Sequence, residues 1–148
     1  MRTGMLKRLG LAAGLAGVGV AGSLIAAAPA SAGPYCDPGN HCVFVAGLGS
    51  ARHSYFNSDS NFTDDYFTGT SVVVSDNVWS ASNSSTGGYE SHYYYDINYG
   101  GGLVFCVNPG SSVNASQLSD DGINGNWVGQ RDEVSSLRLR PATSIRCF

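Results

Sequence analysis

The chain has 148 residues, 13% of them charged, and a formal charge of −3 at pH 7. From residue 33 onward it has no lysine and five arginines against eleven acidic residues, a formal charge of −6. Nucleic acids and anionic membranes select a basic face. We therefore expect neither as a partner of this part of the chain.

The first 32 residues have the pattern of a signal peptide. Arg2, Lys7 and Arg8 precede an apolar stretch over 9–28, and residues 30–32 read Ala-Ser-Ala, a cleavage signal. The stretch is long enough for a membrane anchor, but it is rich in glycine and no positive residues follow it. The pattern predicts a secreted, extracellular protein that begins at Gly33.

The exported part contains four cysteines, an even number that favours two disulfides. Three pairings are possible. Cys36 and Cys42 bracket a turn sequence over 37–41 (DPGNH), so we expect them to pair. This leaves Cys106 to pair with Cys147. A zinc site is the alternative, but the cysteine and histidine spacings do not match one.

The 116 residues beyond the signal peptide predict one all-β domain. No stretch keeps a helical apolar pattern over three turns, and residues 114–121 offer at most one helical turn. Short β-rich runs alternate with clusters of Gly, Asn, Asp and Ser, which is typical of a sandwich or barrel. In the last run Leu137 and Leu139 should point inward, and Arg138 and Arg140 outward. The runs are 42–45, 54–56, 71–74, 93–95, 103–107 and 135–140.

The domain repeats itself weakly, over residues 42–83 and 92–140. Each half has strands around a Gly-rich turn and then a closing passage, 76–81 (DNVWSA) or 131–136 (RDEVSS). These passages lie 55 residues apart, a register that equates Trp79 with Val134. Residues 82–88 would link two Greek keys that share one core, and we expect Trp79 and Leu137 to be buried in it.

These passages resemble the closing motif of the βγ-crystallin superfamily: two Asn/Asp residues, two variable positions, then Ser/Thr-Ser. Residues 76–81 match at five of six positions, with Ala81 in the last, and 131–136 at five of six, with Arg131 in the first. The superfamily's aromatic hairpin containing glycine has its counterpart at 95–101 (YDINYGG). The resemblance implies an all-β, βγ-crystallin-like sandwich of two Greek-key motifs.

Within that superfamily the chain is similar to a secreted bacterial peptidase-inhibitor family typified by the streptomycete metalloproteinase inhibitor. An Ala-rich signal peptide, a small disulfide loop closed by Cys36 and Cys42, and a strand at 43–45 follow in that family's order. The resemblance covers 33–139. It implies a monomeric inhibitor that inserts a loop into the active-site cleft of an extracellular protease. The family's second disulfide is short, whereas Cys106 and Cys147 are far apart.

The alternative function is a calcium-binding structural module without inhibitory activity. Ca²⁺ takes carboxylate, amide, hydroxyl and carbonyl oxygens. In the superfamily the two closing loops lie side by side and exchange ligands, and Arg131 would weaken one of the two sites. By resemblance the ligands are the side chains of Asp76, Asn77, Ser80, Asp132 and Ser135, and the carbonyls of Val78 and Glu133.

We expect no catalysis, and no cofactor other than calcium. His41, His53 and His92 lie in no nucleophile–base motif, and the acid pairs at 64–65 and 120–121 are typical of solvated turns. The tyrosines at 89, 93–95 and 99 have two interpretations. They can stack on sugars, or they can fill the core of a Greek key, and strand alternation should bury at least one of the three at 93–95.

Overall fold

The computed structural model describes residue 33 and residues 35–148, so the predicted signal peptide over 1–32 lies outside the described residues. Strands and single 3₁₀ turns make up the regular structure of this part. None of its helical segments is long and apolar enough to cross a membrane. In chain order the elements are β1 (His41–Phe44), β2 (Arg52–Tyr55), η1 (Phe62–Asp64), β3 (Ser80–Asn83), β4 (Glu90–Tyr94), η2 (Ile97–Tyr99), β5 (Leu103–Val107), β6 (Ser112–Val113), η3 (Ala115–Gln117) and β7 (Ser136–Arg140).

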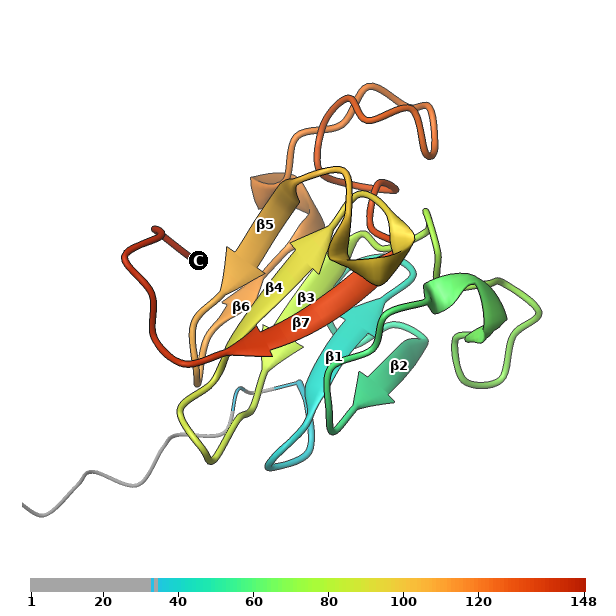
Figure 1. The fold of residues 1–148 in the computed structure, drawn as a ribbon. Helices are drawn as coiled ribbons and strands as arrows, with labels where there is room; N and C mark the ends of the chain where they lie inside the picture. The colour runs from blue at the N-terminus through green and yellow to red at the C-terminus, as the bar shows by residue number, and fades with distance from the viewer. Residues whose placement is uncertain (1–32, 34) are drawn as a thin grey trace, which may run out of the picture.

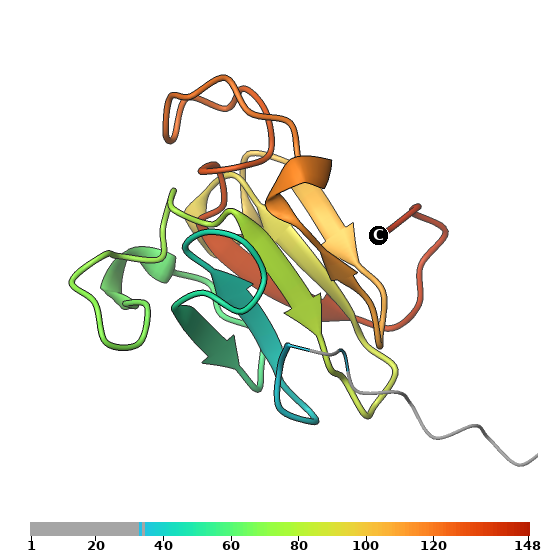
Figure 2. The same cartoon turned by 180° about the vertical axis from the view of Figure 1, so that it is seen from behind.

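The strands form two antiparallel sheets packed face to face (Figure 1). One sheet has the order β5-β4-β7, and the other, nearest the viewer in Figure 2, has the order β2-β1-β3-β6. This confirms the predicted all-β sandwich. The 3₁₀ turn η3 lies within 114–121, where the sequence allowed one helical turn.

The two halves of the chain interlock, because each contributes one segment to the sheet of the other. Strand β6, from the second half, pairs with β3 of the first. Conversely, Asp59 of the first half forms a bridge with Leu137 in β7, and their backbone N–H groups donate to each other's carbonyls at 2.8 and 2.7 Å. Each sheet is therefore completed by chain from the other half, which is the arrangement of paired Greek keys.

The repeat is offset by 56 residues at the closing passages, not by the 55 that the sequence suggested. Asp76 and Asp132 both have a left-handed backbone, with φ of 54° and 58°. The Asp76 N–H donates to the Val134 carbonyl, and the Asp132 N–H donates to the Val78 carbonyl, each at 3.0 Å. Val78 thus corresponds to Val134, and Trp79 corresponds to Ser135.

The corrected register explains why Trp79, which was expected in the core, lies outside it. Leu137 is fully buried between the sheets, as predicted. Trp79 is 37% exposed, and the guanidinium of Arg131 lies over its ring, 5.0 Å from the centroid. Val78 fills the core at this point instead, because alternation in the extended backbone sends adjacent side chains to opposite faces.

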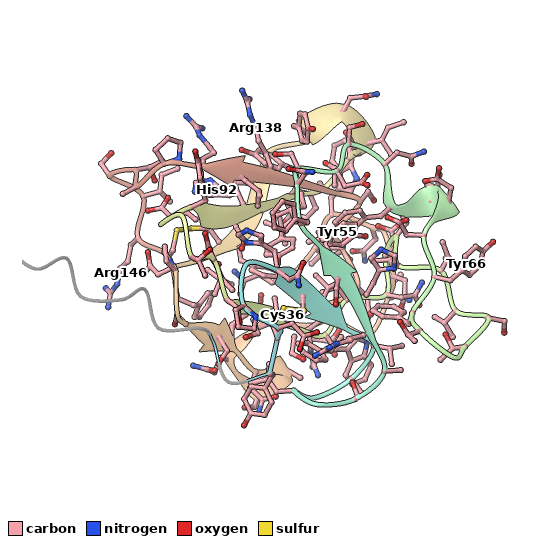
Figure 3. The ribbon with its side chains drawn as sticks, turned by 90° about the horizontal axis from the view of Figure 1, so that it is seen from below. Cys36, Tyr55, Tyr66, His92, Arg138 and Arg146 are labelled. Carbon is pink, nitrogen blue, oxygen red and sulfur yellow. A yellow bond between two sulfur atoms is a disulfide. The ribbon has the colours of Figure 1, made fainter. Side chains whose placement is uncertain are left out.

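The core is continuous across both halves, and it contains aromatic and branched side chains from each sheet. Tyr93 is fully buried within it, whereas Tyr94 and Tyr95 are partly exposed. Arg138 points outward, as expected (Figure 3). The core residues are Val43, Tyr55, Phe62, Phe67, Val74, Val78, Ala81, Tyr93, Val104, Phe105, Val107, Val113, Leu118, Val134 and Leu137.

Three local predictions differ from the structure. Residues 71–74 form no strand and make only an isolated bridge, between Tyr66 and Val73. Strand β3 was not predicted, because Ser-Ala-Ser-Asn has low strand propensity. The predicted linker 82–88 begins inside this strand, and Ser82 to Ser85 are buried. Strand β3 lies between β1 and β6, so its backbone is paired on both sides.

Both predicted disulfides are present, Cys36–Cys42 and Cys106–Cys147. The second fixes the C-terminal tail to the outer edge of β5. The Phe148 N–H donates to the Cys106 carbonyl at 2.9 Å, and the Asn108 N–H donates to the Phe148 carbonyl at 2.8 Å. The tail thereby covers part of a strand edge that would otherwise be open.

Candidate functional site

A group of exposed apolar side chains lies on the loop 119–130, which connects η3 to β7. This loop projects from one end of the molecule in both views (Figures 1 and 2). All residues from 119 to 128 are exposed, including Ile123 (59%), Trp127 (57%) and Val128 (54%). Large side chains rarely remain so exposed together without a partner, which makes the loop a candidate binding surface.

A buried carboxylate holds the tip of this loop. Glu133 is fully buried, and its two carboxylate oxygens accept the backbone N–H groups of Asn126 at 3.4 Å and Trp127 at 2.6 Å. Burial raises the pKa of Glu133, and the two N–H groups counteract this by stabilising the charged form. The same contact supports Trp127 in a left-handed conformation, with φ of 65°. The tip is therefore a fixed turn.

Further bonds fix the base of the loop. The Tyr95 hydroxyl donates to the Gly129 carbonyl at 3.0 Å, and the Gln130 amide donates to the Val104 carbonyl at 3.1 Å. An ion pair joins Arg131 to Asp120. The sequence analysis predicted no site in this loop. Its signal was a tryptophan and an isoleucine set among glycines and asparagines, where turns are usually polar.

Under the loop, the structure brings together two predicted calcium ligands from opposite halves. The Ser135 hydroxyl donates to one carboxylate oxygen of Asp76 at 3.0 Å, and the Ser75 hydroxyl donates to the other at 3.3 Å. Burial raises the pKa of Asp76, the two serine bonds lower it, and the nearby Asp96 carboxylate raises it again. A carboxylate beside hydroxyls and a second carboxylate suits a hard cation such as Ca²⁺.

The position related by the internal repeat does not fit a cation as well. Asp132 faces Trp79, the counterpart of Ser135, so an indole N–H stands where the other position has a hydroxyl oxygen. Burial raises the pKa of Asp132 to about 6, against the lowering effect of the Trp79 hydrogen bond. Its Oδ1 is buried and has no hydrogen-bond partner in the described part of the chain. The residues here therefore offer a cation fewer oxygen ligands than those around Asp76.

Three of the other predicted ligand residues make hydrogen bonds elsewhere. The Asn77 amide donates to the Ser75 carbonyl at 2.9 Å, and the Ser80 hydroxyl donates to the Ala46 carbonyl at 2.6 Å. The Val78 carbonyl accepts the Asp132 N–H, as described above. Glu133, whose carbonyl was the predicted ligand, holds the loop tip through its side-chain carboxylate. The geometry thus joins Asp76 to Ser135 and leaves the remaining predicted ligands outside that contact.

Histidine and cysteine offer no alternative centre in the described residues. His92 lies near Cys106 and Cys147 (Figure 3), with possible ligand atoms within 4.8 Å of one another, but both sulfurs belong to the disulfide. His41 Nδ1 lies 2.6 Å from the Ser91 hydroxyl. Both residues are buried, so this pair does not present a nucleophile to solvent.

Comparison with known proteins supports the fold. No protein-family model matches the chain, and no curated protein matches it. A solved structure reported under "Evolution of the eye lens beta-gamma-crystallin domain fold" is similar to it, with a TM-score of 0.51 and 14% sequence identity. The match covers 76% of this chain and 94% of that chain. The protein therefore has the βγ-crystallin domain fold, as the sequence motifs implied.

Proposed function

We propose that this βγ-crystallin-fold domain is a secreted, non-catalytic, monomeric inhibitor of an extracellular protease, and that the loop 119–130 enters the protease cleft. The observation that carries the proposal is the buried Glu133 carboxylate, which holds the loop backbone at Asn126 and Trp127. A loop fixed before binding loses less conformational entropy in a complex. The two disulfides and the signal-peptide pattern support action outside the cell.

The shape and composition of the loop fit a concave partner. It is convex, it projects beyond the sandwich, and it exposes Ile123, Trp127 and Val128 at its tip. Tryptophan is enriched among the residues that dominate binding energy at protein interfaces. The family that the sequence resembles inhibits metalloproteases, so secreted metalloproteases are the first partners to test.

The mature protein should inhibit at least one secreted protease in a panel of metallo-, serine and cysteine enzymes, with thermolysin among them. Trp127→Ala should raise the inhibition constant by about tenfold or more, since anchor residues contribute at least about 1.4 kcal/mol. Tyr66→Ala is the matched control, because Tyr66 is 54% exposed on a different loop. Unchanged inhibition by the Trp127 variant would exclude the loop 119–130, and an inactive wild type across the panel would refute the proposed function.

A second function, calcium binding, is favoured by the Asp76–Ser135 contact. We propose that Ca²⁺ binds there, with Asp76 supplying the carboxylate and Ser135 the hydroxyl. The Asp132 position would contribute little, because Trp79 replaces the hydroxyl at that place. The site would join the two closing passages and so stabilise the interlocked halves.

Calcium should raise the melting temperature of the mature protein by several degrees. A ligand at 100 times its Kd stabilises the native state by about 2.7 kcal/mol, and this is a shift of several degrees for a domain of this size. Asp76→Asn should remove the shift and still fold, since asparagine tolerates a positive φ. Asp64→Asn is the charge-matched control on an exposed turn. Melts that superimpose in EDTA and in millimolar calcium, with magnesium run alongside, would rule the site out.

A further inference from the structure

A pocket of about 410 Å³ lies at the end of the sandwich opposite the loop 119–130. Its lining comes from the turn before β1, His41 at the start of β1, the segment after β2, the turn between β3 and β4, and Leu139 in β7. In Figure 1 these turns lie at the lower end of the strands, and the loop 119–130 lies at the upper end. The two features are therefore separate sites.

Two exposed aromatic rings form walls of this pocket, and glycines leave room for both. Phe56 is 70% exposed and Tyr89 is 45% exposed. A Cβ atom at Gly39 would lie 3.4 Å from the Phe56 ring, and one at Gly87 would lie 3.0 Å from the Tyr89 ring. The rings thus lie close against bare backbone, with their remaining surface open to solvent. Neither ring is needed for the core, so their exposure has no explanation in packing.

A buried histidine supplies the polar group at the inner end. His41 is only 1% exposed, yet it lines the pocket. Its Nδ1 lies 2.6 Å from the Ser91 hydroxyl, which fixes the ring. Its Nε2 makes no hydrogen bond to any described residue. Burial lowers the pKa of His41 to about 4, so the ring is neutral near pH 7 and offers a single hydrogen bond to a ligand.

Two hydroxyl groups of the lining have a proton left to donate. The Ser58 hydroxyl oxygen accepts the Leu139 N–H at 2.9 Å, and the Ser85 hydroxyl oxygen accepts the Tyr89 N–H at 3.1 Å. Each hydroxyl keeps its own proton available, because in both bonds it is the acceptor. Asn57 and Thr86 add an amide and a third hydroxyl. None of the described residues that line the pocket carries a charge near pH 7.

We propose that this pocket binds a neutral sugar ring. Such a ring has an apolar C–H face that can lie on Phe56 or Tyr89, and an edge of hydroxyls that matches His41, Ser58 and Ser85. A charged ligand would lose its hydration without an opposite charge in return, and a purely apolar one would leave these polar groups unsatisfied. Sites of this kind, with apolar walls and a few convergent polar groups, are typical of small-ligand binding.

The probes are neutral sugars added to the ¹⁵N-labelled mature protein: glucose, galactose, mannose, N-acetylglucosamine, and the disaccharides cellobiose, maltose and chitobiose. At least one should shift amide signals within 39–41, 56–58 and 85–89 and leave those of 119–130 unchanged. Sedimentation with insoluble cellulose, chitin and starch distinguishes binding to a polysaccharide from binding to a free sugar. Glucuronate, which is charged, should not bind.

The variants Phe56→Ala and Tyr89→Ala should each weaken binding by about tenfold or more, which is about 1.4 kcal/mol, because each removes a ring on which the C–H face of the sugar would lie. Tyr66→Ala should bind as the wild type does. Both pocket rings are exposed, so these variants should fold, which a thermal melt verifies. Absence of shifts with every sugar, or sugar binding that survives in the double variant, would overturn the proposal. Neither result depends on protease inhibition or calcium.

Discussion

Replacing Leu137 by alanine is expected to lower the free energy of unfolding by about 2–5 kcal/mol, the range for truncating a fully buried leucine. Leu137 faces Tyr93 across the β4–β7 pair, and its backbone forms the bridge with Asp59. The truncation therefore leaves a cavity where the two halves of the chain meet. Equilibrium unfolding in urea, monitored by fluorescence and by circular dichroism, measures the change.

The neighbouring residue provides the control for this measurement. Arg138 follows Leu137 in β7, but its side chain is exposed. Arg138→Ala should change the unfolding free energy by no more than about 0.5 kcal/mol, as is usual for surface positions. A loss below about 0.5 kcal/mol in the Leu137 variant would place that side chain outside the core and contradict the strand register.

Removal of the Cys106–Cys147 disulfide should destabilise the protein by roughly 4 kcal/mol, and removal of Cys36–Cys42 by roughly 2.4 kcal/mol. In the chain-entropy model the effect grows with the closed loop, and the two bonds have sequence separations of 41 and 6. The longer bond also fixes the tail that covers the edge of β5. We therefore expect the Cys106→Ala/Cys147→Ala variant to associate at high concentration as well.

The two double alanine variants are matched controls for each other, since each removes one disulfide and leaves the other. Urea unfolding gives the stabilities, and sedimentation velocity gives the state of association. If the variant that lacks Cys36–Cys42 proved the less stable of the two, the loop-length account of the stabilities would be wrong, and if the variant that lacks Cys106–Cys147 stayed monomeric, the account of the tail at β5 would be wrong. A reducing agent added to the wild type should reproduce the combined loss.

Strand alternation predicted much of the fold, because aromatic and branched residues in β1, β4, β5 and β7 are rare in turns. It failed at β3, whose Ser-Ala-Ser-Asn sequence is typical of a linker and is a strand only because neighbours on both sides bond to it. The register slipped by one residue at the closing passages for a related reason. Asp132 and Asp76 share a left-handed backbone, and this conformation is invisible in a comparison of residue types.

The candidate sites were predictable only where one short segment carries the chemistry. The closing motif pointed to Asp76 and to Ser135, but their direct contact depends on how the halves dock. Glu133 accepts hydrogen bonds from residues six and seven positions earlier in the chain. These bonds form only because the loop 119–130 turns back on itself, which the sequence did not predict. The pocket at Phe56 and Tyr89 joins segments far apart in the chain, so sequence spacing gave no sign of it.

The two halves exchange β6 and the segment around Asp59, and this exchange affects the order of folding. The bridge from Asp59 to Leu137 closes a loop of more than half the chain, and β6 must return to β3 across β4 and β5. Such non-local pairing raises the contact order and slows folding. The N-terminal half, which emerges first during synthesis, lacks a partner for Asp59 until Leu137 has been made. The native sheets can therefore close only when almost the whole polypeptide is available, so their folding is essentially post-translational.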